Sequence, residues 1–581
     1  MATSVASLAL LLISFSLAAR VHAQAESPAF IDSTAYEDGA YGHYPSQEFI
    51  SSNVRAPRVN ILQTDSRCDD GSYVMLSVRG GTVEYSGPLI LDHAGATIWT
   101  TDRYEAQVYG LNVQKYKGKD FLTLWAGDDS VRGHGVGEYI LLDEAYNEVY
   151  KFGALGGLDG DLHEIKITDQ DTFLISVYQV VPADLTPVDG PLDGWIWDCL
   201  IQELDIETGE VLFQWRASEH YSVTDSTRGL DSEGGQEAPW DWFHMNSIEK
   251  DPWGNYITSS RYLWSVTYIN GTDGVILWML GGKNNSFTDL SVDEGGATAF
   301  KYQHDARWHD NYTTISLFDN NAMDAGTIGL SGHSRGLRIK VDLEAMTAEL
   351  LGEYVNPRGT LGFSQGSTQV LPNGNVFNGY GYTPAYSEFS SDGKLLCNVH
   401  FGPESEFNSG NVQSYRSLKA NWTGLPTTEP SLVMYKDSAY VSWNGATEVK
   451  MWELQSAPSE DAPSESFVSA NMYPKLGFET QLDLLDGIKP FIRVVARDKD
   501  DQIIGASKPV RVQDAILDEL LTEHLQNLPS LRALVGLCSF GTLAIILLEV
   551  SRGRILRQQR PRRPTLGALH LKDNGLQDND R

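Results

Sequence analysis

A hydrophobic run that ends in a turn residue occurs first as Leu89-Ile90-Leu91-Asp92, and the strand after it ends at Trp99. The same pattern returns five times: Ile140-Leu141-Leu142-Asp143 to Phe152, Glu203-Leu204-Asp205 to Trp215, Tyr268-Ile269-Asn270 to Trp278, Lys340-Val341-Asp342 to Tyr354, and Glu388-Phe389-Ser390 to Phe401. Each unit is typical of a β-hairpin, because Asp, Asn and Gly favour the turn between two strands. Six units, each with room for about four strands in roughly 50–65 residues, predict an all-β fold with a six-bladed β-propeller over residues 60–425.

A polar cluster that contains histidine precedes a strand in three of these units. The clusters are His163-Glu164 before residues 172–175, His244-Met245-Asn246 before residues 254–257, and His304-Asp305-Ala306 before residues 314–317. In a propeller, the innermost strand of each blade starts near the central channel, so equivalent starts converge. We therefore expect His163, His244 and His304 to share one pocket.

Composition excludes several classes of protein. The chain has 581 residues, with 44 Lys+Arg against 77 Asp+Glu, and its formal net charge is −33. The hydrophobic fraction of 41% and the aromatic fraction of 10% exclude a disordered chain. The acidic balance argues against nucleic acid as a partner. Because no Gly-x-x-x-x-Gly-Lys-Ser/Thr loop is present, we expect no nucleotide partner, and we expect no cofactor.

The N-terminus indicates the secretory pathway. Residues 8–18 form a short apolar run, and Val21-His22-Ala23 resembles a small-residue cleavage site. We predict a signal peptide over residues 1–23, followed by an N-terminal extension over residues 24–59. The alternative is a membrane anchor that is never cleaved.

The C-terminal part of the chain has a different pattern of apolar and polar residues. Residues 431–511 alternate apolar and polar side chains, which predicts a small β-sandwich of the immunoglobulin kind. Residues 512–530 have the spacing of a juxtamembrane helix, and the apolar run that follows predicts a transmembrane helix over residues 531–550. Six arginines between residues 552 and 563 then follow, in a predicted basic cytosolic tail, residues 551–581. We expect a single-pass type I membrane protein with a lumenal or extracellular ectodomain; a buried or amphipathic helix is the alternative.

Glycosylation sites and cysteines agree with that compartment. Four Asn-X-Ser/Thr triplets predict a glycoprotein: Asn270, Asn284, Asn311 and Asn421. Cys538 lies in the predicted span. The other three cysteines, Cys68, Cys199 and Cys397, allow at most one intramolecular disulfide, and the sequence does not choose among the three pairings.

An ordered set of short segments carries the candidate chemistry. The segments are His244-Met245-Asn246-Ser247, Ser259-Ser260-Arg261, Gln303-His304-Asp305-Ala306, Phe318-Asp319-Asn320 and Ser334-Arg335. With these segments the chain resembles the arylsulfotransferase family over roughly residues 60–425. Members of that family are six-bladed propellers that transfer sulfate between phenols without a nucleotide donor. The apparent anchor and the added sandwich place the chain closer to a divergent, eukaryotic-type branch.

The resemblance implies roles for particular residues. It implies that His304 is the nucleophile that becomes transiently sulfated. It also implies that His163, His244, Asn246 and Arg261 surround the sulfuryl group. Arg335 belongs either to this pocket or to an ion pair between blades. The implied partners are an aryl sulfate donor and a phenolic acceptor.

The chemistry of the residue types is consistent with these roles. A neutral imidazole is a competent nucleophile near pH 7 and forms a covalent intermediate. Arg261 and Asn246 can donate hydrogen bonds to the sulfuryl oxygens as charge develops. His163 or His244 can protonate the departing phenolate and then deprotonate the acceptor, which predicts a ping-pong cycle.

Two other classes of function remain open. Three convergent histidines with Asp305 could bind zinc and activate water, as in a metal-dependent hydrolase. Arg261 argues against a metal, because a cation beside the site repels a divalent ion, and we expect no metal ligands. The other alternative is a non-catalytic propeller ectodomain that binds a ligand or a protein partner.

Overall fold

The structure is a computed structural model that describes residues 27–104, 106–131, 133–321 and 332–512. These residues form strands with short helical turns, so the predicted all-β class is confirmed. The predicted signal peptide (1–23), transmembrane helix (531–550) and basic tail lie outside the described residues, as does the juxtamembrane helix apart from Val512. Within the described part of the chain, no helix is long and apolar enough to cross a bilayer.

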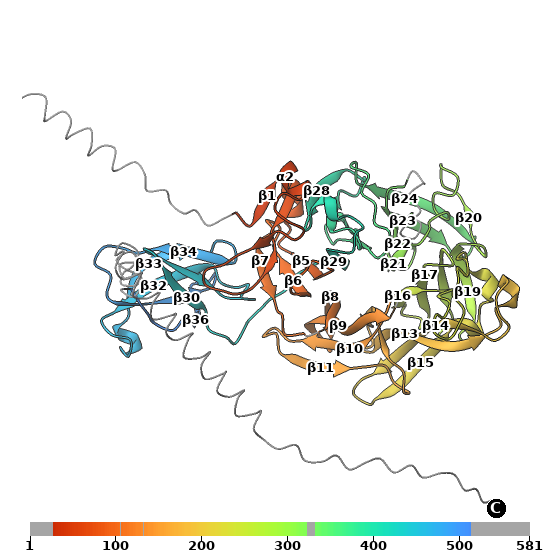
Figure 1. The fold of residues 1–581 in the computed structure, drawn as a ribbon, viewed down its shortest axis with the longest axis horizontal. Helices are drawn as coiled ribbons and strands as arrows, with labels where there is room; N and C mark the ends of the chain where they lie inside the picture. Colours follow the sequence, from red (N-terminus) through yellow and green to blue (C-terminus); the bar gives the residue numbers. More distant parts are fainter. Residues whose placement is uncertain (1–26, 105, 132, 322–331, 513–581) are drawn as a thin grey trace, which may run out of the picture. The chain divides into compact units, whose positions relative to one another are not determined.

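Most strands between residues 29 and 420 belong to five sheets in which nearly all pairs are antiparallel (Figure 1). The first has the order β29-β5-β6-β7, with bounds Gln413–Ala420, Tyr73–Arg79, Gly87–Leu91 and Thr97–Thr100. The second has the order β15-β14-β13-β12-β10-β9-β8, with β11 paired to β10. In chain order, β8 to β15 are Gln107–Tyr116, Lys119–Val131, His134–Leu142, Glu148–Phe152, Gly160–Ile167, Phe173–Ala183, Gly194–Asp205 and Glu210–Arg216.

The third to fifth sheets continue the series. The third is β16 (Met245–Lys250), β17 (Tyr256–Ser260), β18 (Ser265–Ile269) and β19 (Ile276–Gly281) in sequence order. The fourth has the order β20-β24-β23-β22-β21, with β20 to β24 at Thr288–Asp289, His304–His309, Thr314–Asp319, Arg335–Asp342 and Thr347–Val355. The fifth has the order β1-β4-β28-β27-β26-β25, with β25 to β28 at Ser367–Val370, Val376–Gly379, Ala385–Phe389 and Leu395–His400.

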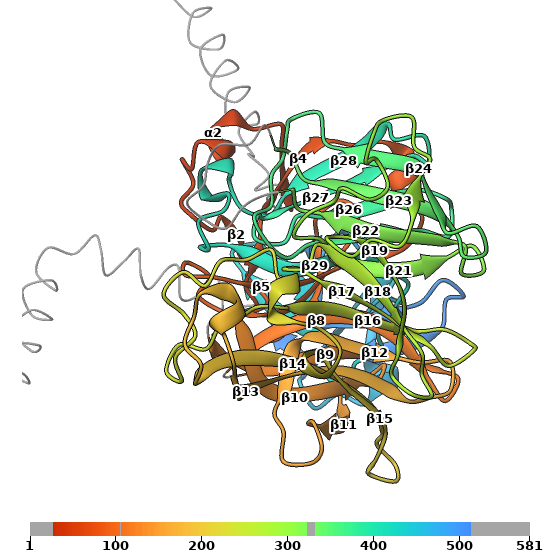
Figure 2. The ribbon, with the colours of Figure 1, turned by 90° about the vertical axis from the view of Figure 1, so that its right-hand side faces the viewer.

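Residues before the first full sheet also join this array. In the predicted N-terminal extension, β1 (Ala29–Ile31) pairs in parallel with β4 (Val59–Gln63). Figure 2 shows β4 beside β28, to which it is hydrogen-bonded. The short helix α2 (Thr34–Glu37) and the pair β2–β3 (Ser46–Gln47 and Ala56–Pro57) lie between these strands in the sequence.

All six hairpins expected from the sequence repeat are present. They are β6–β7, β10–β11, β14–β15, β18–β19, β23–β24 and β27–β28, and each contains a register shift before its turn. A bulge increases the local twist of a strand pair, so the repeated shift gives every hairpin a similar bend. The apolar run that repeats in the sequence therefore corresponds to the two outer strands of each unit.

The inner strands form a closed cycle of contacts. Strand β29 contacts β8, β8 contacts β12, and the series continues through β16, β21 and β25 back to β29. Figure 1 shows the sheets arranged around these strands. The arrangement is propeller-like, and large apolar side chains such as Trp125, Trp242 and Tyr256 fill the space between sheets. The last strand of the cycle in the sequence, β29, is hydrogen-bonded to β5, which is near the start of the chain. This pairing closes the cycle, so no unpaired strand edge is left at the closure.

The final strands form two smaller sheets. One has the order β30-β31-β34 (Ser431–Tyr435, Ser438–Ser442 and Glu479–Asp483). The other has the order β33-β32-β35-β36, with β37 on β35; β32, β33, β35, β36 and β37 are Met451–Ala457, Val468–Pro474, Phe491–Arg497, Ile503–Ala506 and Val510–Arg511. A buried apolar cluster that includes Leu432, Trp452 and Leu482 joins residues of both sheets.

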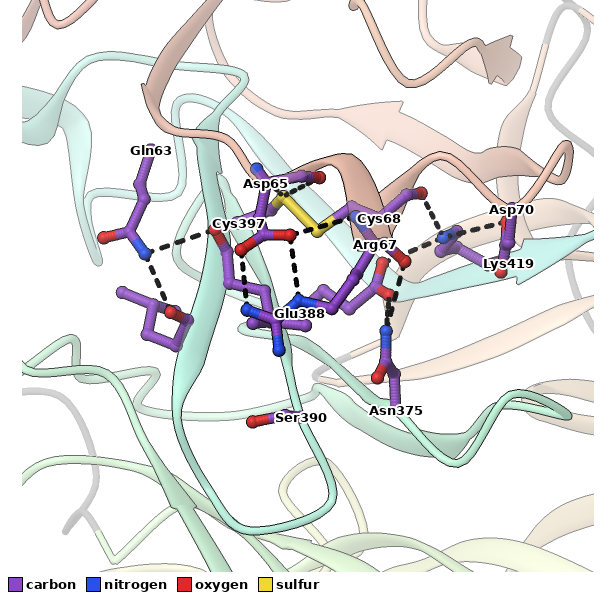
Figure 3. Close-up of a disulfide and its surroundings, with 12 residues drawn as sticks. Gln63, Asp65, Arg67, Cys68, Asp70, Asn375, Glu388, Ser390, Cys397 and Lys419 are labelled. Atoms are coloured by element: carbon purple, nitrogen blue, oxygen red, sulfur yellow. Dashed lines mark hydrogen bonds and ion pairs between the residues drawn. A yellow bond between two sulfur atoms is a disulfide. The ribbon is translucent and has the colours of Figure 1, made fainter.

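A disulfide connects Cys68 with Cys397 across 329 residues (Figure 3). Of the three pairings that the sequence allowed, the structure contains this one, and Cys199 is buried without a disulfide. Beside the bridge, the buried Lys419 ammonium donates to the Cys68 carbonyl (2.9 Å) and pairs with the Glu388 carboxylate (2.8 Å). The bridge thus joins the segment before β5 to β28 of the neighbouring sheet.

Removing this bridge is expected to destabilise the fold. Replacing both cysteines, Cys68→Ala with Cys397→Ala, should lower the free energy of unfolding by about 3–5 kcal/mol, since the bridge closes a very long loop of the unfolded chain. Urea unfolding followed by tryptophan fluorescence measures the change. The Cys199→Ala variant is the control for loss of a buried sulfur, and equal midpoints for the two variants would contradict the expectation.

Candidate active site

A cavity of about 370 Å³ opens at one end of the ring of inner strands and contains all three predicted histidines in its wall. His163 lies on β12, His244 directly precedes β16, and His304 is the first residue of β21. The expectation that these histidines share a pocket is therefore met in the structure. Their three strands are neighbours in the cycle of inner strands.

Local backbone irregularity turns these side chains toward the cavity. Each of the three strands has a register shift at its start, between Gly160 and Ile165, between Met245 and Ser247, and between His304 and Arg307. His244 and Asp305 also have positive φ values of 55° and 58°. Bulges and left-handed non-glycine residues are concentrated at functional sites, where they redirect a side chain.

Hydrogen bonds define which nitrogen of His304 carries the proton. The Asn320 amide group donates to the carbonyls of Gly362 (2.9 Å) and Gln365 (2.8 Å), so the other end of that amide is an acceptor. That oxygen lies 2.7 Å from His304 Nδ1, which must therefore donate. The lone pair is therefore on Nε2, where it accepts a hydrogen bond from the backbone N–H of Gln365 (3.2 Å).

The other two histidines each pair with a buried carboxylate. His163 Nδ1 lies 2.6 Å from Asp161, and His244 Nδ1 lies 2.6 Å from Asp241. The backbone amide of Gly135 (2.9 Å) and the Ser176 hydroxyl (3.0 Å) also donate to Asp161. A carboxylate on Nδ1 holds the imidazole in one orientation and stabilises its protonated form, as in a general acid–base pair.

Burial sets the protonation of this cluster. Burial, the Arg261 guanidinium and nearby imidazoles hold the pKa values of His304 and His244 well below their usual range, although the hydrogen bond that His304 donates to Asn320 opposes the shift of His304. Burial also favours the neutral Asp161 carboxyl, but His163 outweighs it and lowers its pKa to about 2. His304 and His244 are therefore neutral near pH 7 and available as nucleophile or base.

The three predicted substrate-binding residues have different surroundings. Arg261 lines the cavity, and its guanidinium donates to the Tyr262 hydroxyl (2.5 Å) and to the Phe363 carbonyl (3.3 Å). Asn246 does not line the cavity; it is fully buried, and its side-chain amide donates to the carbonyl of Gln303 (2.7 Å), the residue before His304. Arg335 does not line the cavity; it pairs with Asp319 (2.9 Å) and Glu353 (2.5 Å) on neighbouring strands of its own sheet.

A buried group of charges lies beneath the histidines. The Glu164 carboxylate accepts from Arg307 (2.6 Å) and from Arg416 (2.9 Å), and Asp305 lies close to both guanidinium groups. Glu164 is 2% exposed, and a second, smaller cavity on the far side of this group is lined by the same four residues. The four side chains therefore separate the two cavities along the axis of the inner strands.

Several residues of the site were not foreseen. Asp241 stands three positions before His244, a spacing that is visible in the sequence, whereas Arg79 and Arg228 line the cavity from outside the motifs. Aromatic side chains form much of the remaining wall: Tyr109, Trp197, Tyr262, Phe363, Tyr382 and Tyr415. An aromatic wall with a few cations suits a flat, anionic ligand.

Two groups of side chains have the composition of a metal site. They are His134 with Asp241 and His244, and His134 with Asp161 and His163. Asp305, the carboxylate considered with the histidines from the sequence, belongs to neither group and is ion-paired with Arg307 and Arg416.

The fold and the cavity define an all-β protein with a histidine-lined site at the centre of a cyclic array of sheets. A family model described as arylsulfotransferase (ASST) matches residues 112–402. The chain belongs to the arylsulfotransferase family, as its motifs indicated. The match includes His163, His244, Arg261 and His304.

Other comparisons are weaker. The chain is similar to a protein of unknown function from Bacteroides caccae, with 13% identity, 60% of this chain and 98% of that chain covered, and a TM-score of 0.35. It is also similar to the β-propeller domain of Myceliophteria thermophila Cps50 (Swd1), with 10% identity, 57% and 92% covered, and a TM-score of 0.29. Likenesses this weak support no conclusion about function. No curated protein matches the chain.

Proposed function

We propose that the protein is a nucleotide-independent sulfotransferase that moves a sulfuryl group from an aryl sulfate to a phenolic acceptor through a sulfohistidine on His304. The observation that carries the proposal is the Nδ1 hydrogen bond to Asn320, which places the lone pair of a neutral His304 on Nε2, at a cavity shared with Arg261 and two further histidines. A donor must displace the long hydrogen bond from the Gln365 backbone N–H (3.2 Å) to reach that lone pair. Membership of the arylsulfotransferase family supports the reaction class.

The proposed cycle has two half-reactions. In the first, His304 Nε2 attacks the sulfur of the donor, the bond from sulfur to the aryl oxygen breaks, and the phenolate takes a proton from a protonated His163 or from water, because neutral His244 has none to give. In the second, His244 acts as the base: it removes the proton of the acceptor phenol and passes it to His163 or to water, while the phenol oxygen attacks sulfur and releases His304. Arg261 stabilises the sulfuryl oxygens in both half-reactions, and Asp241 and Asp161 stabilise the protonated imidazoles.

The direct test is mass spectrometry of the purified protein after incubation with p-nitrophenyl sulfate. We expect release of nitrophenol, a sulfate-mass adduct on the peptide that contains His304, and loss of that adduct when a phenol is added. Folded protein that neither releases nitrophenol nor gains the adduct, across several aryl sulfates, would refute the proposal.

The first half-reaction should depend little on pH in the neutral range. Because the pKa of His304 is held well below its usual range, the imidazole stays unprotonated as the pH falls through about 6.5, where an ordinary histidine gains its proton. The rate of adduct formation in stopped-flow assays should therefore be nearly constant from about pH 8 to about pH 6. A loss of about fourfold between pH 8 and pH 6, with half of the rate lost near pH 6.5, would instead indicate an unperturbed histidine.

Replacing Arg261 with lysine tests whether a positive charge alone supports sulfate transfer or whether the planar guanidinium is needed. The Arg261→Lys variant keeps the positive charge but loses the planar fork of donors, so we expect sulfate transfer to fall by roughly 10- to 100-fold. The matched control is Arg335→Lys, whose ion pairs lie outside the cavity, and it should change the rate by less than about twofold. Similar losses in both variants would place Arg335 in the reaction.

We also propose the finer points of architecture and location. The closed cycle of six inner strands supports a six-bladed β-propeller, and the two small sheets support an immunoglobulin-like sandwich over residues 431–511. The Cys68–Cys397 disulfide is consistent with a lumenal or extracellular ectodomain. Asn284, Asn311 and Asn421 are exposed and Asn270 is partly exposed, which is compatible with glycosylation. The membrane anchor at residues 531–550 remains a prediction.

A metal-dependent hydrolase is the second candidate, and the two His–Asp groups around His134 favour it. Its reaction would be hydrolysis by a metal-activated water rather than transfer. Metal analysis of the purified protein decides between them: one equivalent of bound zinc, with activity lost on chelation, would support the hydrolase.

A further inference from the structure

A fourth histidine, His134, lies behind the cavity wall and has no part in the proposed cycle. It is the first residue of β10, and its side chain is 1% exposed. Neither ring nitrogen has a hydrogen-bond partner. A buried imidazole without partners is costly, because each polar group loses its hydrogen bonds to water.

Aromatic packing fixes the plane of this ring. The His134 ring stacks on Tyr178, with 4.1 Å between ring centroids and 27° between planes, and it also contacts Trp197 at 4.8 Å. The His244 ring lies 5.4 Å away. The imidazole is therefore held beside the site residues rather than directed to solvent.

The nearest acceptor for His134 is the Asp241 carboxylate. His134 Nε2 lies 3.6 Å from Asp241 Oδ2, the oxygen that also binds His244 Nδ1 at 2.6 Å. Asp241 Oδ1 is buried without a partner. Each of these two residues thus has an unsatisfied polar atom, and a displacement of less than about 1 Å would bring His134 Nε2 within hydrogen-bond distance of Asp241 Oδ2.

We propose that His134 is a positioning residue, which donates its Nε2 proton to Asp241 and thereby holds that carboxylate ionised and aligned on His244. The consequence for catalysis rests on the proposed function, since His244 is there the acid–base group. Other charged or titratable groups around this contact are Asp161, His163, Arg228 and Arg261. Burial raises the pKa of Asp241, and His134 and the two guanidinium groups act against that rise and favour the ionised carboxylate.

Two substitutions separate the hydrogen bond from the packing. His134→Phe keeps an aromatic ring between Tyr178 and Trp197 but removes the donor. His134→Gln places an amide donor near the position of Nε2 but loses the ring. If the hydrogen-bond donor matters, His134→Gln retains the function of His134 and His134→Phe loses it. If only the aromatic packing matters, His134→Phe retains the function and His134→Gln loses it.

Chemical reactivity gives a readout that does not require catalysis. Diethyl pyrocarbonate modifies neutral imidazoles, and peptide mass spectrometry of the full-length protein gives the ratio of modification rates at His244 and His304 in one sample. An ionised Asp241 makes His244 more basic, so at about pH 7 this ratio should fall about threefold in His134→Phe and stay near the wild-type value in His134→Gln. The internal ratio corrects for differences in folded fraction.

Kinetics test the catalytic consequence. With p-nitrophenyl sulfate, His134→Phe should lower kcat about tenfold with little change in KM, and His134→Gln should recover most of the rate. An unchanged modification ratio in His134→Phe, or a lower ratio in Gln than in Phe, overturns the role of His134. If the wild-type protein shows no adduct on His304, the proposed function fails, while the modification ratio still decides whether His134 supports Asp241.

Discussion

The His304→Ala variant should lose sulfate transfer by at least about a thousandfold and should show no sulfate adduct. His304 Nε2 is the only proposed covalent attachment point, and its loss leaves Arg261 and the Asp–His pairs with no nucleophile to assist. The side chain is buried and hydrogen-bonded to Asn320, so the variant also removes a packed group.

A second substitution tests whether misfolding, rather than loss of the nucleophile, explains the loss of sulfate transfer. His304→Asn retains an amide of similar reach and should unfold at nearly the wild-type temperature, yet it should be equally inactive. Adduct mapping by peptide mass spectrometry and nitrophenol release measure both variants. The control is His93→Ala, at a half-exposed histidine far from the cavity lining, which should keep full activity. An adduct on another histidine in His304→Ala would assign the nucleophile elsewhere.

The Glu164→Gln variant should lower the free energy of unfolding by about 3–5 kcal/mol. Glu164 is the carboxylate that balances Arg307 and Arg416, and those guanidinium groups lower its pKa to about 2 although burial favours the neutral form. A neutral amide leaves two buried cations with Asp305 as their remaining nearby carboxylate, and uncompensated buried charge is strongly destabilising.

Urea unfolding gives the stability of this variant. The matched control is Asp500→Asn, which removes the carboxylate of an exposed ion pair with Lys499 and should change stability by less than about 0.5 kcal/mol. Equal and small losses in both variants would show that the buried group contributes no more than a surface pair. Because the pKa of Glu164 is lowered from 4.5 to about 2 in the folded protein, its contribution should be complete in the neutral range and should be lost as the pH falls from 4.5 to about 2.

Local patterns in the sequence accounted for much of the fold. The apolar runs that end at Asp92, Asp143 and their counterparts correspond to six outer hairpins, because strand and turn preferences act over a few neighbouring residues. The histidines at 163, 244 and 304 were likewise placed in one pocket, since equivalent starts of inner strands converge in a cyclic array.

Long-range contacts could not be predicted in the same way. Arg335 follows a motif serine, yet its guanidinium pairs with Asp319 and Glu353 of its own sheet. Arg416, by contrast, lies in no motif but reaches Glu164 across 252 residues of sequence. The choice of partner for a long, charged side chain depends on where the backbone brings opposite charges together, and no local pattern encodes that distance.

The sequence by itself determined the all-β class, the outer hairpins, the arylsulfotransferase motifs and the convergence of three histidines, because each depends on residue type and short spacing. Only the tertiary structure decided the Cys68–Cys397 pairing, the carboxylates that hold the site histidines, the proton-bearing nitrogen of His304 and the place of His134. These features arise between residues far apart in the chain or from hydrogen-bond geometry, and both are fixed only when the sheets pack around their common centre.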